Sequence, residues 1–161
     1  MGMIGCFLAV DRASAILLRQ PGADVPGFIN GHDEADEGMD VDKAWQLIHF
    51  GLTGAAYEGQ GVLAQAVMGG TGIGEDVGYG PARILDAAEV AAVAAALTPI
   101  GPVEFTALFT GRDAHGVDLY PLHGRAVTPD DIAYATETYS ELRQYYLAAA
   151  ARGDAMLLYI S

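Results

Sequence analysis

Six side chains of the kinds that act in catalysis or hold ligands lie in or near two distinctive passages of this sequence. They are Trp45, His49, Glu75, Asp76, Tyr79 and Arg83. If the second passage folds over the first, His49 can act as a general base and Arg83 can hold a carboxylate. A structural role is preferred, in which His49 fixes a helix to a loop. In that role Arg83 forms an ion pair with Glu75 or Asp76.

The second passage is the glycine-rich run from Gly69 to Leu85, which reads GGTGIGEDVGYGPARIL. Backbone N–H groups in such runs can bind phosphate. This run does not complete G-x-G-x-x-G, and no lysine follows it as in a P-loop. Glu75 and Asp76 also place negative charge where phosphates would lie. We therefore interpret the glycines as a loop of tight turns and close backbone contacts.

Other groupings fail as metal or catalytic sites. The acidic stretch from Asp33 to Asp42 resembles a calcium loop, but aligning Gly38 with the fixed glycine puts alanines at ligand positions. A second group shares one loop but matches no recognised ligand spacing: Asp113, His115, Asp118 and His123. Cys6 lies in an apolar run where its thiol is inert, and no serine nucleophile motif occurs. We expect no metal, no cofactor and no recognisable catalytic motif.

Composition limits the partners. The chain has 161 residues with a formal net charge of -13, from 21 Asp and Glu against eight Lys and Arg. This charge repels phosphate backbones, and the few cations form no basic stripe, so nucleic acid is not expected as a partner. A basic protein surface or a small ligand is a better match, and the oligomeric state stays open.

We expect no targeting signal and no membrane-spanning segment. The apolar start MGMIGCFLAV lacks a cationic region and is too short for a signal peptide, and no apolar stretch approaches the roughly 20 residues of a membrane span. Cys6 is the only cysteine, so a reducing compartment suits the chain. We expect a cytoplasmic protein without membrane association.

Apolar spacing and capping residues predict the elements that position these groups. A strand is expected over residues 3–10, then a helix over 12–19 capped by Asp11. The segment 20–40 is expected to be irregular. A helix capped by Asp40 carries Trp45 and ends at Gly54. Residues 62–68 are expected to form a strand that enters the glycine-rich run.

In the second half of the chain, the sequence predicts mainly helices. Residues 83–85 are expected to form a short strand, Asp86 and Glu89 a capping box before a buried helix, and residues 103–109 a short helix. After a loop over 111–127, Thr128 caps a long helix that Gly153 ends, and residues 155–160 form a final strand. The expected fold is a single α/β domain over residues 1–161, or mixed α+β, with one mixed β-sheet flanked by helices.

Four passages together resemble the YfbM-like family of small bacterial proteins, whose function is unknown. They are MGMIGCFLAVD, DKAWQLIHFGLTG, GEDVGYGPARIL and AAARGDAMLLYIS, in this order along nearly the whole chain. The resemblance implies one compact domain with sheet and helices, and it brings no catalytic residues to carry over.

Two functions remain open at this point. The preferred hypothesis is a non-catalytic protein-binding module, of a partner-sequestering or immunity-like kind, in which the acids from Asp33 to Asp42 attract a basic partner. The alternative is an enzyme or small-ligand-binding protein with a polar pocket between the Trp45 and His49 helix and the glycine-rich run. The alternative requires those side chains to meet in one cavity.

Overall fold

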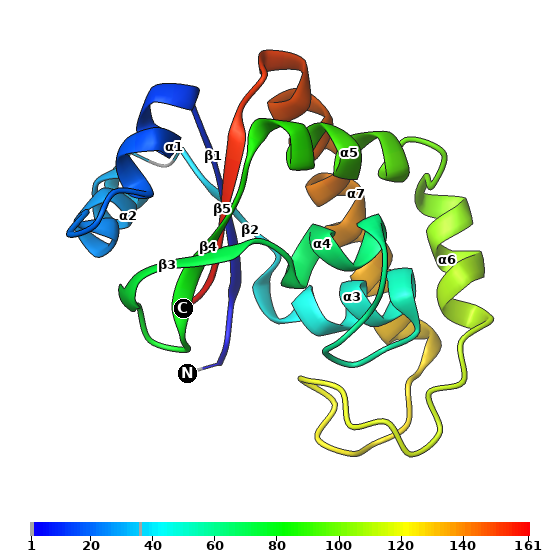
Figure 1. Ribbon diagram of the computed structural model, residues 1–161. Helices are drawn as coiled ribbons and strands as arrows, with labels where there is room; N and C mark the ends of the chain where they lie inside the picture. The colour runs from blue at the N-terminus through cyan, green and yellow to red at the C-terminus, as the bar shows by residue number, and fades with distance from the viewer. Residues whose placement is uncertain (1, 36) are drawn as a thin grey trace.

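The structure of the protein is a computed structural model that describes residues 2–35 and 37–161. Most of the expected elements are present (Figure 1). In chain order the elements are β1 (Gly5–Val10), α1 (Arg12–Leu18), α2 (Val25–Glu34), β2 (Met39–Asp40), the 3-10 helix η1 (Asp42–Ala44), α3 (Trp45–Thr53), α4 (Val62–Met68), β3 (Thr71–Asp76), β4 (Pro81–Leu85), α5 (Ala87–Leu97), α6 (Pro102–Thr110), α7 (Pro129–Arg152) and β5 (Ala155–Ile160).

The strands form one five-stranded sheet in the order β2-β1-β5-β4-β3, and every pairing in it is antiparallel. The fold is therefore mixed α+β, with the long helix α7 followed by the final strand, as expected, but the sheet is antiparallel throughout and not the mixed sheet that was expected. The central strand is β5, which pairs with β1 from Ala155 to Ile160 and with β4 near Leu157.

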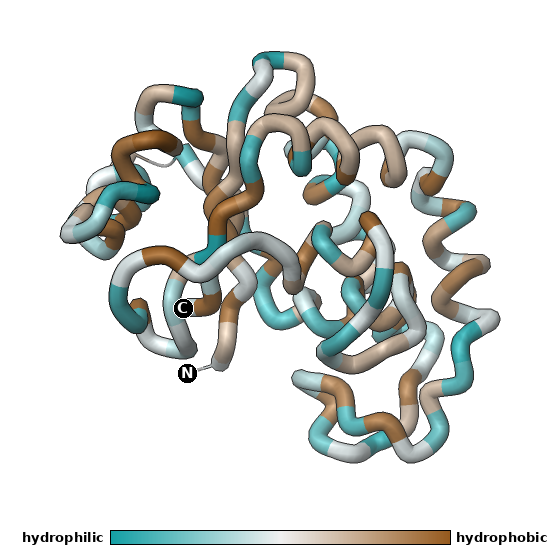
Figure 2. Tube along the Cα trace, in the orientation of Figure 1, coloured by the Kyte–Doolittle hydropathy of each residue, from teal (hydrophilic) through white to brown (hydrophobic). Residues whose placement is uncertain are grey.

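Helices cover both faces of the sheet because alternate strand residues point to opposite sides. Phe7 and Leu158 face the larger core with α3 to α7, whereas Leu8 and Leu157 face a smaller core under α1 and α2. Figure 1 shows α1 and α2 on one side of the strands and the other helices on the opposite side. Hydrophobic residues run through the central strands, while the long loop between α6 and α7 mixes both kinds (Figure 2).

Two segments differ from the expectation. Residues 62–68 form the helix α4 and not a strand, because an apolar run bounded by glycine fits either element and this one is rich in alanine and other helix formers. The segment 20–40 is not wholly irregular, since Asp24 caps helix α2 and the helix accommodates Pro26 in its first turn.

The glycine-rich run is a β-hairpin and not a loop of turns. Its first half is strand β3, which pairs with β4 and carries a bulge between Ile73 and Asp76. Gly74 has a φ of +68° and lies against Val25, where a Cβ atom would come within 2.9 Å of that side chain. Glycine is therefore required there both for the backbone conformation and for the contact between β3 and α2.

The capping predictions are confirmed except at Asp40, which accepts a hydrogen bond from Asp42 N but caps no helix: the N-cap of α3 is Ala44, and η1 precedes it. Asp11 accepts a hydrogen bond from Ser14 N, and capping boxes open α5 at Asp86 and α7 at Thr128. Gly54 and Gly153 end α3 and α7 in the left-handed conformation. These local signals fix the helix boundaries because each satisfies backbone groups that a helix end leaves open.

Arginine side chains bind the C-terminal ends of three helices. Arg112 donates to the carbonyl oxygens of α3, at Gly51 and Leu52, and Arg143 donates to those at the end of α5, at Leu97 and Thr98. A guanidinium at these positions satisfies open carbonyls and complements the negative end of the helix dipole. The third case, Arg83 on α4, belongs to the predicted site.

No single helix in the described ranges combines the length and apolar character of a membrane span. The pair α5 and α6 meets both criteria jointly, with a bend of 80° between the two helices.

Candidate functional site

The hairpin that carries Glu75, Asp76 and Tyr79 leans toward α2 and away from α3. Gly72 to Glu75 line a groove together with the α1–α2 connection, and Asp76 lines another with Asp33 and Tyr159. Asp76 Oδ1 accepts hydrogen bonds from Gly78 N at 2.7 Å and Gly80 N at 3.1 Å, which closes the hairpin turn. Tyr79 stands at the tip with 56% of its surface exposed.

His49 is fully buried on α3 and contacts a different loop. Its Nε2 lies 3.1 Å from the carbonyl oxygen of Glu58, so this nitrogen carries the proton and donates. Its Nδ1 has no hydrogen-bond partner among the described residues. Burial lowers the pKa of His49, and the nearby charge of Arg83 acts in the same direction. His49 thus fixes α3 to the segment before α4.

Trp45 also serves as an anchor. Its Nε1 donates to the carbonyl oxygen of Met3 at 3.2 Å, and its ring stacks on Tyr120 with 5.8 Å between centroids and 24° between planes. Only 4% of its surface is exposed. Trp45 therefore joins the N-terminal end of β1 to the long loop between α6 and α7.

Arg83 points to the end of α4 in place of the expected ion pair. Its guanidinium donates to the carbonyl oxygen of Gly69 at 2.9 Å and to that of Val67 at 3.3 Å. Among the described residues it forms no ion pair with Glu75 or Asp76. Burial lowers the pKa of Arg83, although the carbonyls at the helix end compensate its charge.

The six predicted residues therefore divide into two groups. Trp45, His49 and Arg83 lie on the α3 and α4 side and have structural contacts. Glu75, Asp76 and Tyr79 lie on the exposed hairpin, and no hydrogen bond between described residues joins them to His49. The contacts of the described residues therefore do not bring the six side chains together between α3 and the glycine-rich run.

Acidic side chains gather where the segment 37–42 meets α7. Glu37, Asp40 and Asp42 are exposed, and Asp42 accepts a hydrogen bond of 2.6 Å from the hydroxyl of Tyr134 on α7. The Tyr145 hydroxyl accepts from Ala9 N at 2.7 Å at the open edge of β1. Asp36 and the side chain of Glu34, which belong to the predicted acidic stretch, lie outside what the structure describes.

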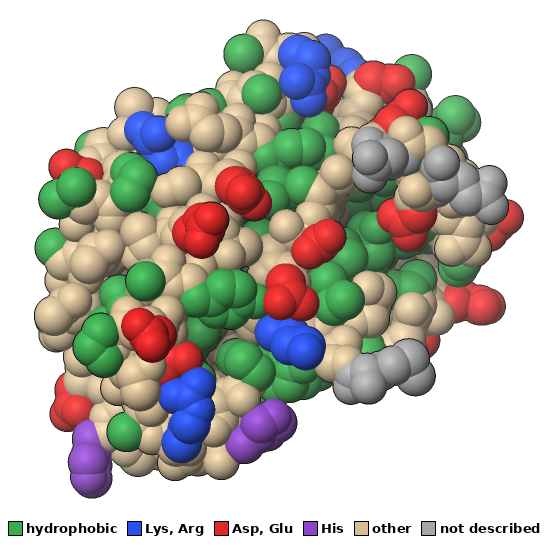
Figure 3. Space-filling model, turned by 180° about the vertical axis from the view of Figure 1, so that it is seen from behind, with side chains coloured by type: hydrophobic (Ala, Val, Ile, Leu, Met, Phe, Trp, Pro, Cys, Tyr) green, Lys and Arg blue, Asp and Glu red, His purple; other side chains and the backbone are tan. Residues whose placement is uncertain are grey.

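Glu141 extends this acidic group onto the long helix. It lies at helical spacing between Tyr134 and Tyr145, on the stripe of α7 that faces the segment 37–42. We call Glu37, Asp40, Asp42 and Glu141 the acidic face. Seen from behind, acidic side chains lie around a hydrophobic patch on this side of the molecule, with a Lys or Arg side chain against one of them (Figure 3).

No ion pair between described residues joins a Lys or Arg to this face, although Lys43 follows Asp42 in the chain. Arg83, Arg112 and Arg143 bind helix ends, and the Lys and Arg ion pairs between described residues are Arg125 with Asp131 and Arg152 with Asp154. His32 approaches Glu37 at 3.3 Å and pairs with it only when protonated. The negative potential therefore extends into solvent.

A second feature is the loop over residues 111–127, which contains no helix or strand yet is held at several points. Gln46, fully buried on α3, accepts from Tyr120 N at 2.6 Å through Oε1 and donates to the carbonyl oxygen of Ala56 at 2.9 Å. Leu119 and Leu122 are buried in the larger core. Loops of this length that are anchored rather than mobile are frequently functional.

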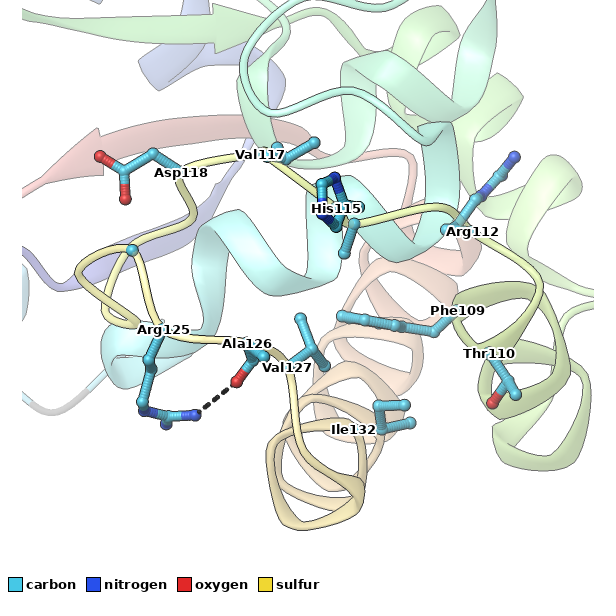
Figure 4. A pocket seen from close by; sticks show the side chains of 13 residues that line it. Phe109, Thr110, Arg112, His115, Val117, Asp118, Arg125, Ala126, Val127 and Ile132 are labelled. Carbon is cyan, nitrogen blue, oxygen red and sulfur yellow. Dashed lines mark hydrogen bonds between the residues drawn. The ribbon is translucent and has the colours of Figure 1, made fainter.

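This loop encloses a pocket of about 620 Å³ against α6 and α7 (Figure 4). Its apolar side is formed by Phe109, Val127 and Ile132, and its polar lining includes His115 and Arg125. Figure 4 shows His115 between the two legs of the loop and Asp118 turned away from the space they enclose. We call this space the loop pocket.

The sequence indicated the acids of residues 33–42 as a surface for a basic partner, but it indicated neither the contribution of Glu141 nor the loop pocket. His115 and Asp118 were considered only as metal ligands, and no group of three or more His, Cys, Asp or Glu side chains in the described ranges is placed to hold a metal. Cys6 is half-buried near Ser161, and burial raises the pKa of its thiol. The length of the loop between α6 and α7 was the signal that could have identified the loop pocket.

Comparison with known proteins gives the family. Residues 1–159 match the family described as Domain of unknown function (DUF1877). The crystal structure of a protein of unknown function, YfbM from Escherichia coli, superposes with a TM-score of 0.71 and 23% sequence identity, covering 98% of this chain and 99% of that one. No curated protein matches the chain. The chain thus belongs to the DUF1877 family and has the YfbM-like fold.

Proposed function

We propose that this protein is a non-catalytic binding module that uses its acidic face to hold a basic protein partner. The observation that supports the proposal is that the arginines and the carboxylates of the acidic face lie in different parts of the fold. Three arginines bind helix carbonyls, so the exposed carboxylates of the acidic face keep their charge without a Lys or Arg partner among the described residues. Such a face accelerates association with a cationic surface and selects for it.

The shape of the acidic face adds to its charge. Tyr134 and Tyr145 lie beside the carboxylates and offer aromatic surface on which a lysine or arginine side chain can rest. The hydroxyl of Tyr134 orients Asp42, so this carboxylate is held in place before a partner arrives. A partner-sequestering role, of the kind that immunity proteins have, requires only such a surface and no catalytic group.

The test uses two variants of equal charge. One carries Glu37→Gln, Asp40→Asn and Glu141→Gln on the acidic face. The matched control carries Glu75→Gln, Glu104→Gln and Asp118→Asn at exposed positions elsewhere. Both variants lose three negative charges, so a difference between them reports on position and not on net charge.

The tagged protein is expressed in its source cells and treated with a carbodiimide, which joins carboxylates to contacting lysines, and the products are mapped by mass spectrometry. We expect cross-links at Glu37, Asp40 and Glu141 to lysines of one partner, and their loss at high salt. We expect the face variant to lose the partner and the control to keep it. Equal capture by both variants, or cross-links centred on other carboxylates, would refute the proposal.

A further inference from the structure

We propose that the loop pocket binds a small organic carboxylate with an apolar ring system. This site is separate from the acidic face and independent of its proposed partner. The volume of about 620 Å³ lies within the range of roughly 300–1,000 Å³ that is usual for small-molecule sites. A fused aromatic ring can lie against Phe109, Val127 and Ile132, which form the apolar side.

The local charge explains the preference for a carboxylate. The protein carries a formal net charge of -13, yet Arg112, His115 and Arg125 all line this pocket. Asp118 is the one lining residue with a carboxylate, and Figure 4 shows it directed away from the enclosed space, as are the ends of the Arg112 and Arg125 side chains in that view. Arg112 donates to the α3 carbonyls and Arg125 pairs with Asp131, so the groups that can meet an anion here are the remaining donors of Arg125 and the imidazole of His115.

Arg125 keeps one hydrogen-bonding edge for a ligand. Its Nη1 and Nη2 bind the two carboxylate oxygens of Asp131 at 2.7 Å each, and Nη1 also donates to the carbonyl oxygen of Ala126 at 3.1 Å. The edge formed by Nε and the second hydrogen of Nη2 has no partner among the described residues. A carboxylate can bind this edge through two parallel hydrogen bonds, and Asp131 holds the guanidinium in place for it.

His115 supplies a second polar group. Its backbone N–H is held by Asp113 Oδ1 at 3.0 Å, which fixes the turn that presents the side chain. The imidazole makes no hydrogen bond to a described residue, so it is available to donate to a ligand oxygen. The anchoring of the loop through Tyr120 and Gln46 keeps both legs of the pocket in position.

The experiment compares 1-naphthylacetate with the neutral 1-naphthylacetamide, which has the same ring and nearly the same shape. Binding is measured by titration with heteronuclear NMR. For an unoptimised ligand of this size we expect a Kd on the order of 1 mM for the carboxylate. We expect shifted amide resonances within residues 109–132 and binding of the amide at least fivefold weaker. Failure of the carboxylate to bind, or equal affinity for the two compounds, would overturn the proposal.

Variants then identify the residues involved. We expect His115→Asn and Arg125→Lys each to weaken carboxylate binding at least threefold, because the first removes the imidazole and the second removes the two-donor edge. His123→Asn is the matched control, since His123 lies in the same loop but does not line the pocket. Asparagine also tolerates the φ of 51° at this position. Equal losses in the control and in His115→Asn would show that the site is elsewhere.

Discussion

The hydroxyl of Tyr146 on α7 donates a hydrogen bond of 2.7 Å to the carbonyl oxygen of Ala66 on α4, and both residues are fully buried. Seven residues earlier on α7, Tyr139 donates to the carbonyl oxygen of Ile100 at 2.7 Å. Arg143, between them, donates to the end of α5. One stripe of the long helix thus satisfies open carbonyls of its neighbours, so α7 organises the larger core through polar contacts as well as apolar ones.

Removal of the Tyr146 hydroxyl tests this role. We expect Tyr146→Phe to lower the free energy of unfolding by about 1 to 2 kcal/mol, because the carbonyl of Ala66 stays buried without its donor. Urea denaturation followed by circular dichroism measures the change. Tyr57→Phe is the control, since Tyr57 is 59% exposed and its hydroxyl has no partner among the described residues. Equal stability of the two variants would contradict the assignment.

Arg83 closes α4 from the sheet side. We expect Arg83→Ala to lower the free energy of unfolding by about 2 kcal/mol, since it removes charge-assisted bonds to Val67 and Gly69 at the negative end of the helix. Arg19→Ala removes the same charge from an exposed site and should change stability by less than about 0.5 kcal/mol. The comparison uses urea midpoints at one salt concentration. A variant at Arg83 as stable as the one at Arg19 would contradict this role.

His49 predicts a pH dependence of stability. Its pKa is lowered by burial, whereas in the unfolded chain it returns to about 6.5. Below that value the unfolded chain binds a proton that the folded one does not, so the contribution of His49 to stability is complete above about pH 6.5 and falls as the pH decreases toward its folded pKa. We expect the urea midpoint of the wild type to drop between pH 7.5 and 5.5. In His49→Gln the drop should be smaller; an identical pH profile would exclude His49 as the source.

The hydrogen bonds of Gln46 lead us to expect that one substitution lowers stability and also loosens the loop that forms the loop pocket. Gln46→Leu leaves the Tyr120 amide and the Ala56 carbonyl without their partner, which should cost about 2 to 4 kcal/mol. The exposed Gln144→Leu is the control. We also expect faster amide hydrogen exchange within residues 112–127 in the Gln46 variant only, because the loop loses its central anchor. Unchanged exchange there would mean that other contacts hold the loop.

The sequence allowed most elements to be predicted because their signals are local. Asp11, Asp86 and Thr128 cap helices in the structure as their positions indicate, and Gly54 and Gly153 end them. The prediction of a strand over residues 62–68 was wrong because the length of this apolar run and its bounding glycines fit a strand as well as a helix. Strand β3 was not predicted because glycine has low strand propensity. Neither the pairing of β3 with β4 nor its contact with Val25 can be read from the local sequence.

The candidate site could not be predicted in the same way, because residue spacing along the chain does not give the distances between side chains in the folded protein. His49 was expected to fix its helix to the glycine-rich run and Arg83 to pair with Glu75 or Asp76, but both side chains bind backbone carbonyls elsewhere, of Glu58 and of Val67 and Gly69, which any sequence provides. Trp45 and Tyr120 meet across 75 residues, and Tyr134 meets Asp42 across 92 residues. Only the fold brings these pairs together, and with them the acidic face and the loop pocket.

The central strand β5 and its neighbour β1 lie far apart in the sequence. Ile4 and Ser161 exchange backbone hydrogen bonds of 2.9 and 3.0 Å beside the paired strands β1 and β5. While a ribosome still holds residues 155–160 in its tunnel, β1 lacks its main neighbour and β4 lacks its inner one, so the sheet cannot assemble. The complete sheet therefore depends on a contact between strands far apart in the sequence, and the edges of β1 and β4 stay unpaired until residues 155–160 are available.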